Sequence, residues 1–152
     1  RELGQLRVIV EDPALKANVT FSNNTGYAIM RITTEVAAGE LAAKRKEWDG
    51  AVLHLERAVR YEDSLIYTEP ADWPQPVRQR LGAVLLDAGR ADEAEAVYWE
   101  DLRKNTGNGW SLFGLMQALK AQKKNADAAL VQQRVEKVWK DADVTPSGSA
   151  IR

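Results

Sequence analysis

Apolar side chains recur every three or four residues along most of the chain, and Gly and Pro fall between these apolar segments. This period places apolar residues on one face of a helix, whereas Gly and Pro favour turns and helix ends. The pattern predicts seven helices, at residues 1–11, 25–46, 49–63, 75–89, 91–105, 108–123 and 125–140. No segment alternates apolar and polar residues for long enough to predict a strand. The predicted fold class is therefore all-α.

Residues at the ends of these segments support the assignment. Asn24 or Thr25 is expected to accept hydrogen bonds from the free amides of the second helix, and Pro76 suits a first helical turn. Gly89 and Asn105 are expected to adopt the left-handed conformation that ends many helices.

Two segments share one internal spacing. Twelve residues separate Gly39 from Ala51, and twelve separate Gly82 from Ala94. Two antiparallel helices approach closely only where one side chain is nearly absent and its partner is small. Each Gly and Ala pair is therefore predicted to mark a crossing point between two consecutive helices, above and below which larger residues fill the core.

A third copy of this spacing begins near Trp110. Its first helix carries Phe113 and Gly114, and a turn follows near residues 123–124. Ala126 keeps the twelve-residue spacing, whereas the turn residues favour Ala128 and a slightly longer first helix. Both registers remain open at this point.

The repeat resembles the tetratricopeptide family over residues 32–140. The clearest copy has a large residue, Leu-Gly, another large residue, Ala and an aromatic at the family's spacing; these positions are Arg78, Leu81, Gly82, Leu85, Ala94, Tyr98 and Thr106. Arg78 and Thr106 stand where the family has Trp and Pro. The distance from Gly39 to Gly82 is 43 residues, against a family period of about 34, which indicates an insertion at 62–76.

A closer resemblance is to the C-terminal region of large bacterial tetratricopeptide proteins. The run from Glu62 through Trp73 to Arg78 and the later Asn108-Gly109-Trp110 carry it. The resemblance implies helix pairs stacked in a right-handed superhelix. Residues 1–31 are then a leading helix and loop that completes an upstream repeat, and 141–152 a frayed tail. Arg1 and the odd number of helices favour a piece of a longer protein.

The resemblance also implies that first-helix residues face a partner on the concave side. The residues expected there are Val36, Glu40, Gln79, Ala83, Ser111 and Leu115, with Arg78 beside them. The Lys, Arg and Asn clamp by which related domains hold a terminal carboxylate is not evident. A protein or peptide is therefore the expected partner, without a carboxylate anchor.

The insertion offers a second candidate surface. Residues 62–74 contain four acids and no base, and Tyr67, Glu69, Asp72 and Trp73 lie close together in sequence. Acidic groups beside aromatic faces suit a basic peptide, because an aromatic face attracts cations and Trp is a frequent interface anchor. The alternative is that Tyr67 and Trp73 fill the wider gap between the first two helix pairs.

Composition removes several classes of function. The formal net charge of −1 gives no long-range attraction to nucleic acid or to an anionic membrane. The absence of cysteine excludes disulfides and thiol chemistry. No apolar run is long enough to span a membrane, so a soluble protein is expected, more readily cytoplasmic than secreted. The oligomeric state is not indicated.

Catalytic chemistry has no candidate group of residues, and no cofactor or metal site is predicted. His54 is interpreted as structural or solvated rather than as a metal ligand or base, because both chemistries need further groups. The basic run 44–46 is interpreted as a solvated helix end rather than a phosphate contact.

The leading prediction is a non-enzymatic scaffold that binds protein or peptide. The alternative is a structural cap on a longer helical array. An enzyme and an RNA-reading repeat rank below both.

Overall fold

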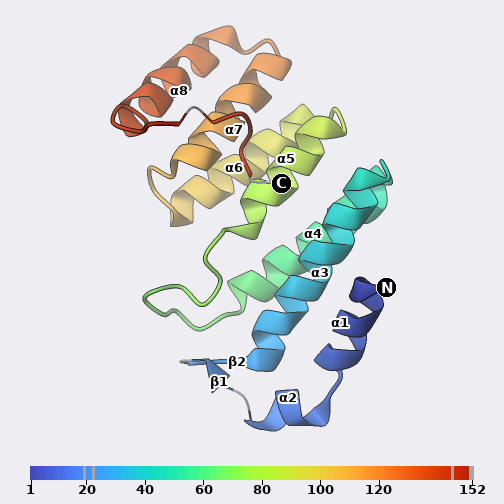
Figure 1. The fold of residues 1–152 in the computed structure, drawn as a ribbon. Coiled ribbons are helices and arrows are strands. Elements are labelled where there is room, and N and C mark those ends of the chain that lie inside the picture. Colours follow the sequence, from blue (N-terminus) through green and yellow to red (C-terminus); the bar gives the residue numbers. More distant parts are fainter. Residues whose placement is uncertain (19, 22, 145, 151–152) are drawn as a thin grey trace. The chain divides into compact units, whose positions relative to one another are not determined.

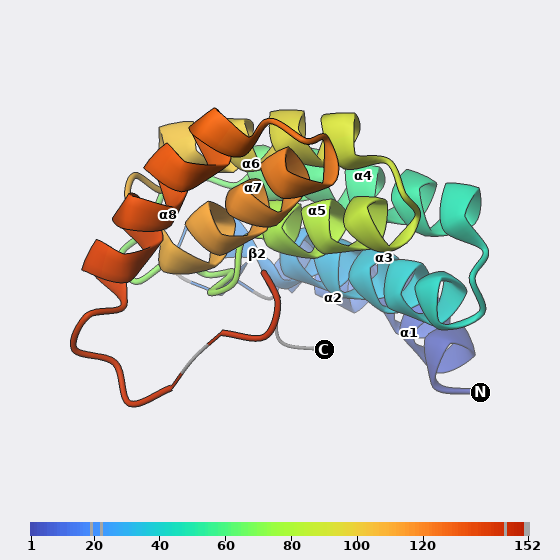
Figure 2. The ribbon, with the colours of Figure 1, turned by 90° about the horizontal axis from the view of Figure 1, so that it is seen from above.

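The computed structural model describes residues 1–18, 20–21, 23–144 and 146–150 (Figures 1 and 2). The chain divides into two units, Arg1–Val77 and Arg78–Arg152. Over the described ranges, every element longer than two residues is a helix. The all-α fold class is therefore confirmed.

The first unit contains four helices and one short hairpin within its described residues. In chain order they are α1 (Glu2–Val10), α2 (Pro13–Asn18), β1 (Thr20–Phe21), β2 (Asn24–Thr25), α3 (Gly26–Lys44) and α4 (Trp48–Asp63). The two strands pair antiparallel, with Thr20 opposite Thr25. Helices α3 and α4 pack along each other, and α1 and α2 pack on α3.

The close approach of α3 to α4 depends on Gly39. A Cβ atom on this residue would lie 2.7 Å from Cγ of Leu55 and 3.2 Å from the carbonyl oxygen of Ala51. Ala51 and Leu55 are fully buried, as is Ile32 on α3. The predicted crossing of Gly39 and Ala51 is thus confirmed. Thr25 caps α3, since its hydroxyl accepts from the Ala28 amide at 3.1 Å.

The second unit contains the remaining helices, α5 (Val77–Asp87, whose first residue is the last of the first unit), α6 (Ala91–Lys104), α7 (Gly109–Ala121) and α8 (Asn125–Val138). Helix α7 packs against both α6 and α8. The ring of Tyr98 on α6 is fully buried and lies where a Cβ on Gly82 or on Gly114 would be. Two glycines on separate helices therefore make room for one aromatic ring.

Three helix hairpins turn in the same way. Lys46, Gly89 and Lys123 each have a positive φ, of 60°, 76° and 62°. In each turn the next amide donates to a carbonyl five residues earlier, as in the Arg90 to Leu85 bond of 2.8 Å, which is the bond that closes a Schellman motif. The prediction for Gly89 is confirmed. The one for Asn105 is wrong, because its φ is −110° and Gly107 takes the positive φ instead.

Several local predictions differ from the structure. The short helix α2 and the hairpin of β1 and β2 were not predicted, and Pro76 lies just before α5 rather than inside its first turn. In the third pair Ala128 is buried and Ala126 is exposed. The longer register is therefore correct.

The C-terminal segment also differs from the frayed tail that its sequence suggested. Ser149 is 1% exposed, and its hydroxyl bonds to groups on α5 and α6. Residues 146–150 are thus a packed part of the second unit.

Candidate functional site

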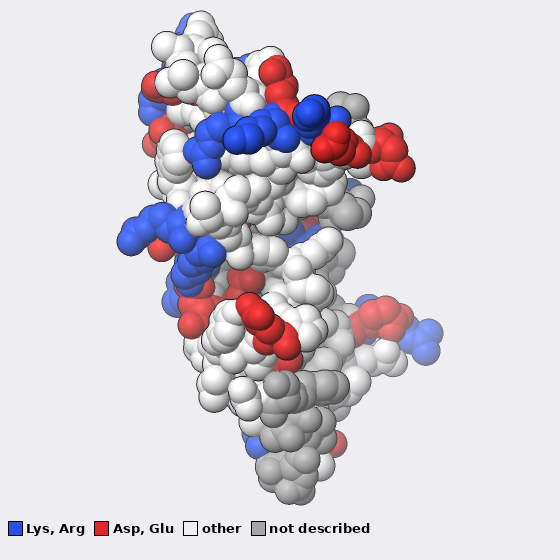
Figure 3. Space-filling view, turned by 90° about the vertical axis from the view of Figure 1, so that its left-hand side faces the viewer, with Lys and Arg blue, Asp and Glu red and all other residues white. Residues whose placement is uncertain are grey.

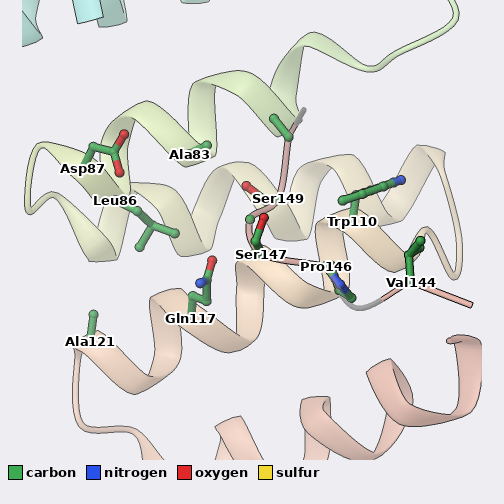
Figure 4. A pocket seen from close by; sticks show the side chains of 12 residues that line it. Ala83, Leu86, Asp87, Trp110, Gln117, Ala121, Val144, Pro146, Ser147 and Ser149 are labelled. Carbon is green, nitrogen blue, oxygen red and sulfur yellow. The ribbon is translucent and has the colours of Figure 1, made fainter. Parts of the chain in front are cut away.

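A cavity of about 880 Å³ lies in the second unit, between α5, α7 and the C-terminal segment (Figure 4). Small and uncharged side chains predominate in its walls. The lining residues are Ala83, Leu86 and Asp87 of α5, Trp110, Gln117 and Ala121 of α7, and Val144, Pro146, Ser147, Gly148, Ser149 and Ala150. We call the surface formed by α5 and α7 the groove, and residues 146–150 the tail.

Ser149 anchors the tail. Its hydroxyl forms a short hydrogen bond with the hydroxyl of Tyr98 and donates to the carbonyl oxygen of Gln79 at 3.4 Å. Either hydroxyl can be the donor in the bond between Tyr98 and Ser149. Both polar contacts are buried, which makes them specific for a hydroxyl at this position.

The composition of the tail explains how it fits. Figure 4 shows Ser147 and Ser149 between Ala83 of α5 and Gln117 of α7. Ser147 is exposed and Ser149 is buried. A Cβ on Gly148 would meet only the carbonyl oxygen of Ala150, at the ordinary distance of 3.7 Å. The space beside Gly148 is therefore not restricted by the helices, and the buried side chain of the tail is that of Ser149.

The residues predicted to face a partner do not all lie on one exposed surface. Ala83 lines the groove. Ser111 and Leu115 are fully buried, and the Gln79 side chain is 5% exposed, so the expected exposure of these three is wrong. Helix α7 packs against two helices, which covers more of its circumference than a one-sided helix pattern allows for.

Ser111 has a structural contact that the sequence did not indicate. Its hydroxyl donates to the carboxylate of Asp101, which is 1% exposed. The same carboxylate accepts from the side-chain amide nitrogen of Asn105 at 2.9 Å. This buried carboxylate holds the end of α6 to the start of α7. Arg78 is half-buried on α5, and Val36 and Glu40 are half-buried on α3 in the first unit.

The insertion at 62–76 belongs to the first unit. The Tyr67 ring is 77% exposed, so it does not fill a gap in the core. Its hydroxyl donates to the carboxylate of Glu69, and this hydrogen bond raises the pKa of Tyr67. Trp73 is half-buried, and its indole nitrogen has no hydrogen-bond partner among the described residues. The two aromatics therefore lie in different environments.

Asn24 fixes the insertion to the hairpin. Its amide nitrogen donates to the Ile66 carbonyl and to the Asp72 carboxylate, both at 2.8 Å. Its amide oxygen accepts from the Ile66 amide at 2.8 Å. The predicted cap role therefore falls to Thr25 alone, and Asp72 is engaged within the unit. We treat the insertion as the weaker of the two candidate surfaces.

The histidine is paired with a single acid. Nδ1 of His54 lies 2.6 Å from a carboxylate oxygen of Glu35, and this pair joins α4 to α3. Within the described ranges, no three His, Asp or Glu side chains are placed to hold a metal ion. In those same ranges, no helix is both long and apolar enough to cross a membrane.

Charge is dispersed on the face drawn in Figure 3. Blue and red side chains occur in small groups with uncharged surface between them. This distribution agrees with the formal net charge of −1, and it favours no polyanionic ligand on this face.

A smaller hollow of about 220 Å³ lies beside α6 and α8, with Glu95 at its edge. The Glu95 carboxylate accepts from the Lys124 ammonium at 2.6 Å and from the Gln122 amide at 2.7 Å. The hydrogen bond from Lys124 is the main reason that the pKa of Glu95 is lowered. The carboxylate therefore ties α6 to the turn between α7 and α8.

This lowered pKa predicts a pH dependence of stability. The folded state binds the Glu95 proton less tightly than an unfolded chain, whose Glu pKa is about 4.3. The stabilisation is therefore present above that value and lost as pH falls through the lower folded pKa. We expect Glu95→Gln to cost about 0.2–1 kcal/mol at pH 7 and less at low pH.

Thermal melting at both pH values checks this expectation, with Glu136→Gln on the exposed face of α8 as a control for the lost charge. A Glu95→Gln deficit that is equal at both pH values would contradict it.

Comparison with protein-family models, with curated proteins and with solved structures finds no match. Function must therefore be inferred from the chain's own residues.

Proposed function

We propose that this chain is a non-enzymatic, tetratricopeptide-type domain that binds a short protein segment in the groove of the second unit. The observation that carries the proposal is the tail itself. Residues 146–150 already lie in the groove, and Ser149 is buried against Tyr98 and Gln79. A surface that holds one short segment has the shape and the hydrogen-bond groups to hold another.

The repeat features give independent support. Gly39 meets Leu55, while Gly82 and Gly114 meet Tyr98, and three hairpins share one turn geometry. Helices packed in this regular way form a rigid surface, on which binding costs little ordering of the receptor. Among the residues that line the groove, the charged one is Asp87, which does not favour a polyanion.

The experiment screens a library of short unstructured peptides against the full chain and compares two variants. Ala83→Arg places a long cation in the groove, whereas Ala129→Arg makes the same change on an exposed face of α8. Selected peptides should bind Ala129→Arg as they bind the wild type, and Ala83→Arg at least about tenfold more weakly, a loss of about 1.4 kcal/mol. Selected peptides that bind all three proteins equally would refute a site in the groove.

A second candidate is a structural role at the other end of the chain. Helix α1 exposes Val8 and Ile9, which are 74% and 49% exposed, beside Gly4 and Gln5. An apolar face of this kind suits packing against a neighbouring helical repeat. This role predicts that Val8→Glu weakens association with such a repeat and leaves peptide binding in the groove unchanged.

A further inference from the structure

We infer that the tail is a built-in competitor for the groove, and that the groove selects a short, bent segment with one hydroxyl side chain at the anchor position. This inference rests on the proposed function and adds to it the class of ligand and the way in which access is controlled. It is carried by the contacts of Ser149 and by the absence of large side chains from residues 146–150.

The selectivity follows from what surrounds Ser149. The residue is 1% exposed, so a larger side chain at this position has no solvent to reach. Its hydroxyl meets the Tyr98 hydroxyl and the Gln79 carbonyl. An alanine there would remove the buried hydrogen bond to Tyr98, whose loss typically weakens binding about three- to tenfold. Both size and hydrogen bonding therefore favour serine.

The neighbouring positions set a looser requirement. Ser147 is exposed, so its position does not restrict the size of the side chain. Pro146 is half-buried and restricts the backbone that leads to the anchor. The groove thus recognises a short pattern: proline, two positions that the helices do not restrict, and then serine.

Competition follows from the covalent link. The tail is joined to α8 through residues that follow Val138, so its local concentration at the groove is on the order of millimolar. A free segment of equal intrinsic affinity binds only to the fraction of molecules whose tail has left. A partner and the tail therefore cannot occupy the groove at the same time.

The test uses the full chain and the probe peptide acetyl-Pro-Ser-Gly-Ser-Ala-amide. Ser149→Arg cannot seat its side chain at the buried anchor, so the tail should leave the groove. Ser147→Arg introduces the same residue at the exposed position two residues earlier, where the tail should stay. Calorimetry then gives the peptide affinity of the wild type and both variants, and circular dichroism confirms that their helicity is equal.

We expect Ser149→Arg to bind the peptide at least about tenfold more tightly than the wild type. This factor follows if the tail leaves the groove open in fewer than about one wild-type molecule in ten. Ser147→Arg should match the wild type. A peptide with Arg in place of the anchor serine should bind none of the three proteins.

Tyr98→Phe, added to Ser149→Arg, keeps the ring and removes the anchoring hydroxyl. It should weaken peptide binding about three- to tenfold, the loss expected for one hydrogen bond. An unchanged affinity would refute recognition of the hydroxyl.

The remaining outcomes separate this inference from the proposed function. Equal affinity of the wild type and Ser149→Arg refutes competition by the tail but leaves peptide binding in the groove intact. If Ser149→Arg binds library peptides but not the probe, the inferred ligand class is wrong. If it binds no peptide at all, both proposals fail. A concentration-dependent dimer that Ser149→Arg abolishes would place the tail in a second copy of the chain and overturn the intramolecular competition.

Discussion

Replacing Tyr98 by Ala is expected to cost the second unit about 3–5 kcal/mol, the range for removing a large buried aromatic side chain. The ring is fully buried and lies against Gly82 of α5 and Gly114 of α7. Its loss opens a cavity where three helices meet. Urea unfolding followed by circular dichroism measures the effect, which approaches the whole stability of a typical domain.

Tyr67→Ala is the matched control. It makes the same chemical change at a side chain that is 77% exposed, where substitutions usually alter stability by less than about 0.5 kcal/mol. Equal unfolding midpoints for the two variants would contradict the central place of Tyr98. A large loss with Tyr67→Ala would show instead that the insertion depends on this ring.

Gly82→Ala is expected to destabilise the second unit by about 1–3 kcal/mol, because an added methyl group overpacks a filled core. Its Cβ would lie 2.6 Å from a ring carbon of Tyr98, and the ring is held on its other side by Gly114. Thermal melting gives the size of the effect.

Gly50→Ala serves as the comparison for this change. It adds the same methyl group on α4, where a Cβ would have no heavy atom within 4 Å. An alanine in a helix is ordinarily more stable than a glycine by up to about 1 kcal/mol. Gly50→Ala should therefore raise the melting temperature or leave it unchanged. Stabilisation by both substitutions would mean that the Tyr98 ring is not confined.

The helices could be predicted because their apolar residues repeat with a period near 3.6, and because Gly39 and Gly82 mark where partners approach. The six-residue helix α2 was missed, since it is too short to display a period. A local signal for it was nevertheless present. Asp12 precedes Pro13, and its carboxylate accepts from the Ala14 amide at 2.8 Å, as expected for residues that begin a helix.

The candidate site was only partly predictable. Ala83 could be placed on the groove from the repeat alone. Ser111 and Asp101 carry polar side chains on helices, and no pattern in the sequence shows that they satisfy each other in the core. The anchoring hydrogen bonds of Ser149 join residues 51 and 70 positions apart. Contacts at such separations are set by tertiary packing, which local periodicity does not encode.

Small residues made the tail resemble a disordered end. Pro, Gly and Ser are common in unstructured segments, and they provide no apolar face for a helix or strand. The tail packs on the unit through the hydroxyl of Ser149. A hydrogen bond of this kind leaves no signal in the hydropathy of the sequence.

The position of the tail in the chain also sets an order of events during synthesis. A ribosome makes α5 through α8 before it makes residues 146–150, and chains begin to fold while they are still being made. The groove can therefore be complete while its own tail is not yet available. On the proposed competition, a partner present during synthesis would meet the groove before the tail occupies it, whereas a partner added to the finished protein would bind only when the tail has left.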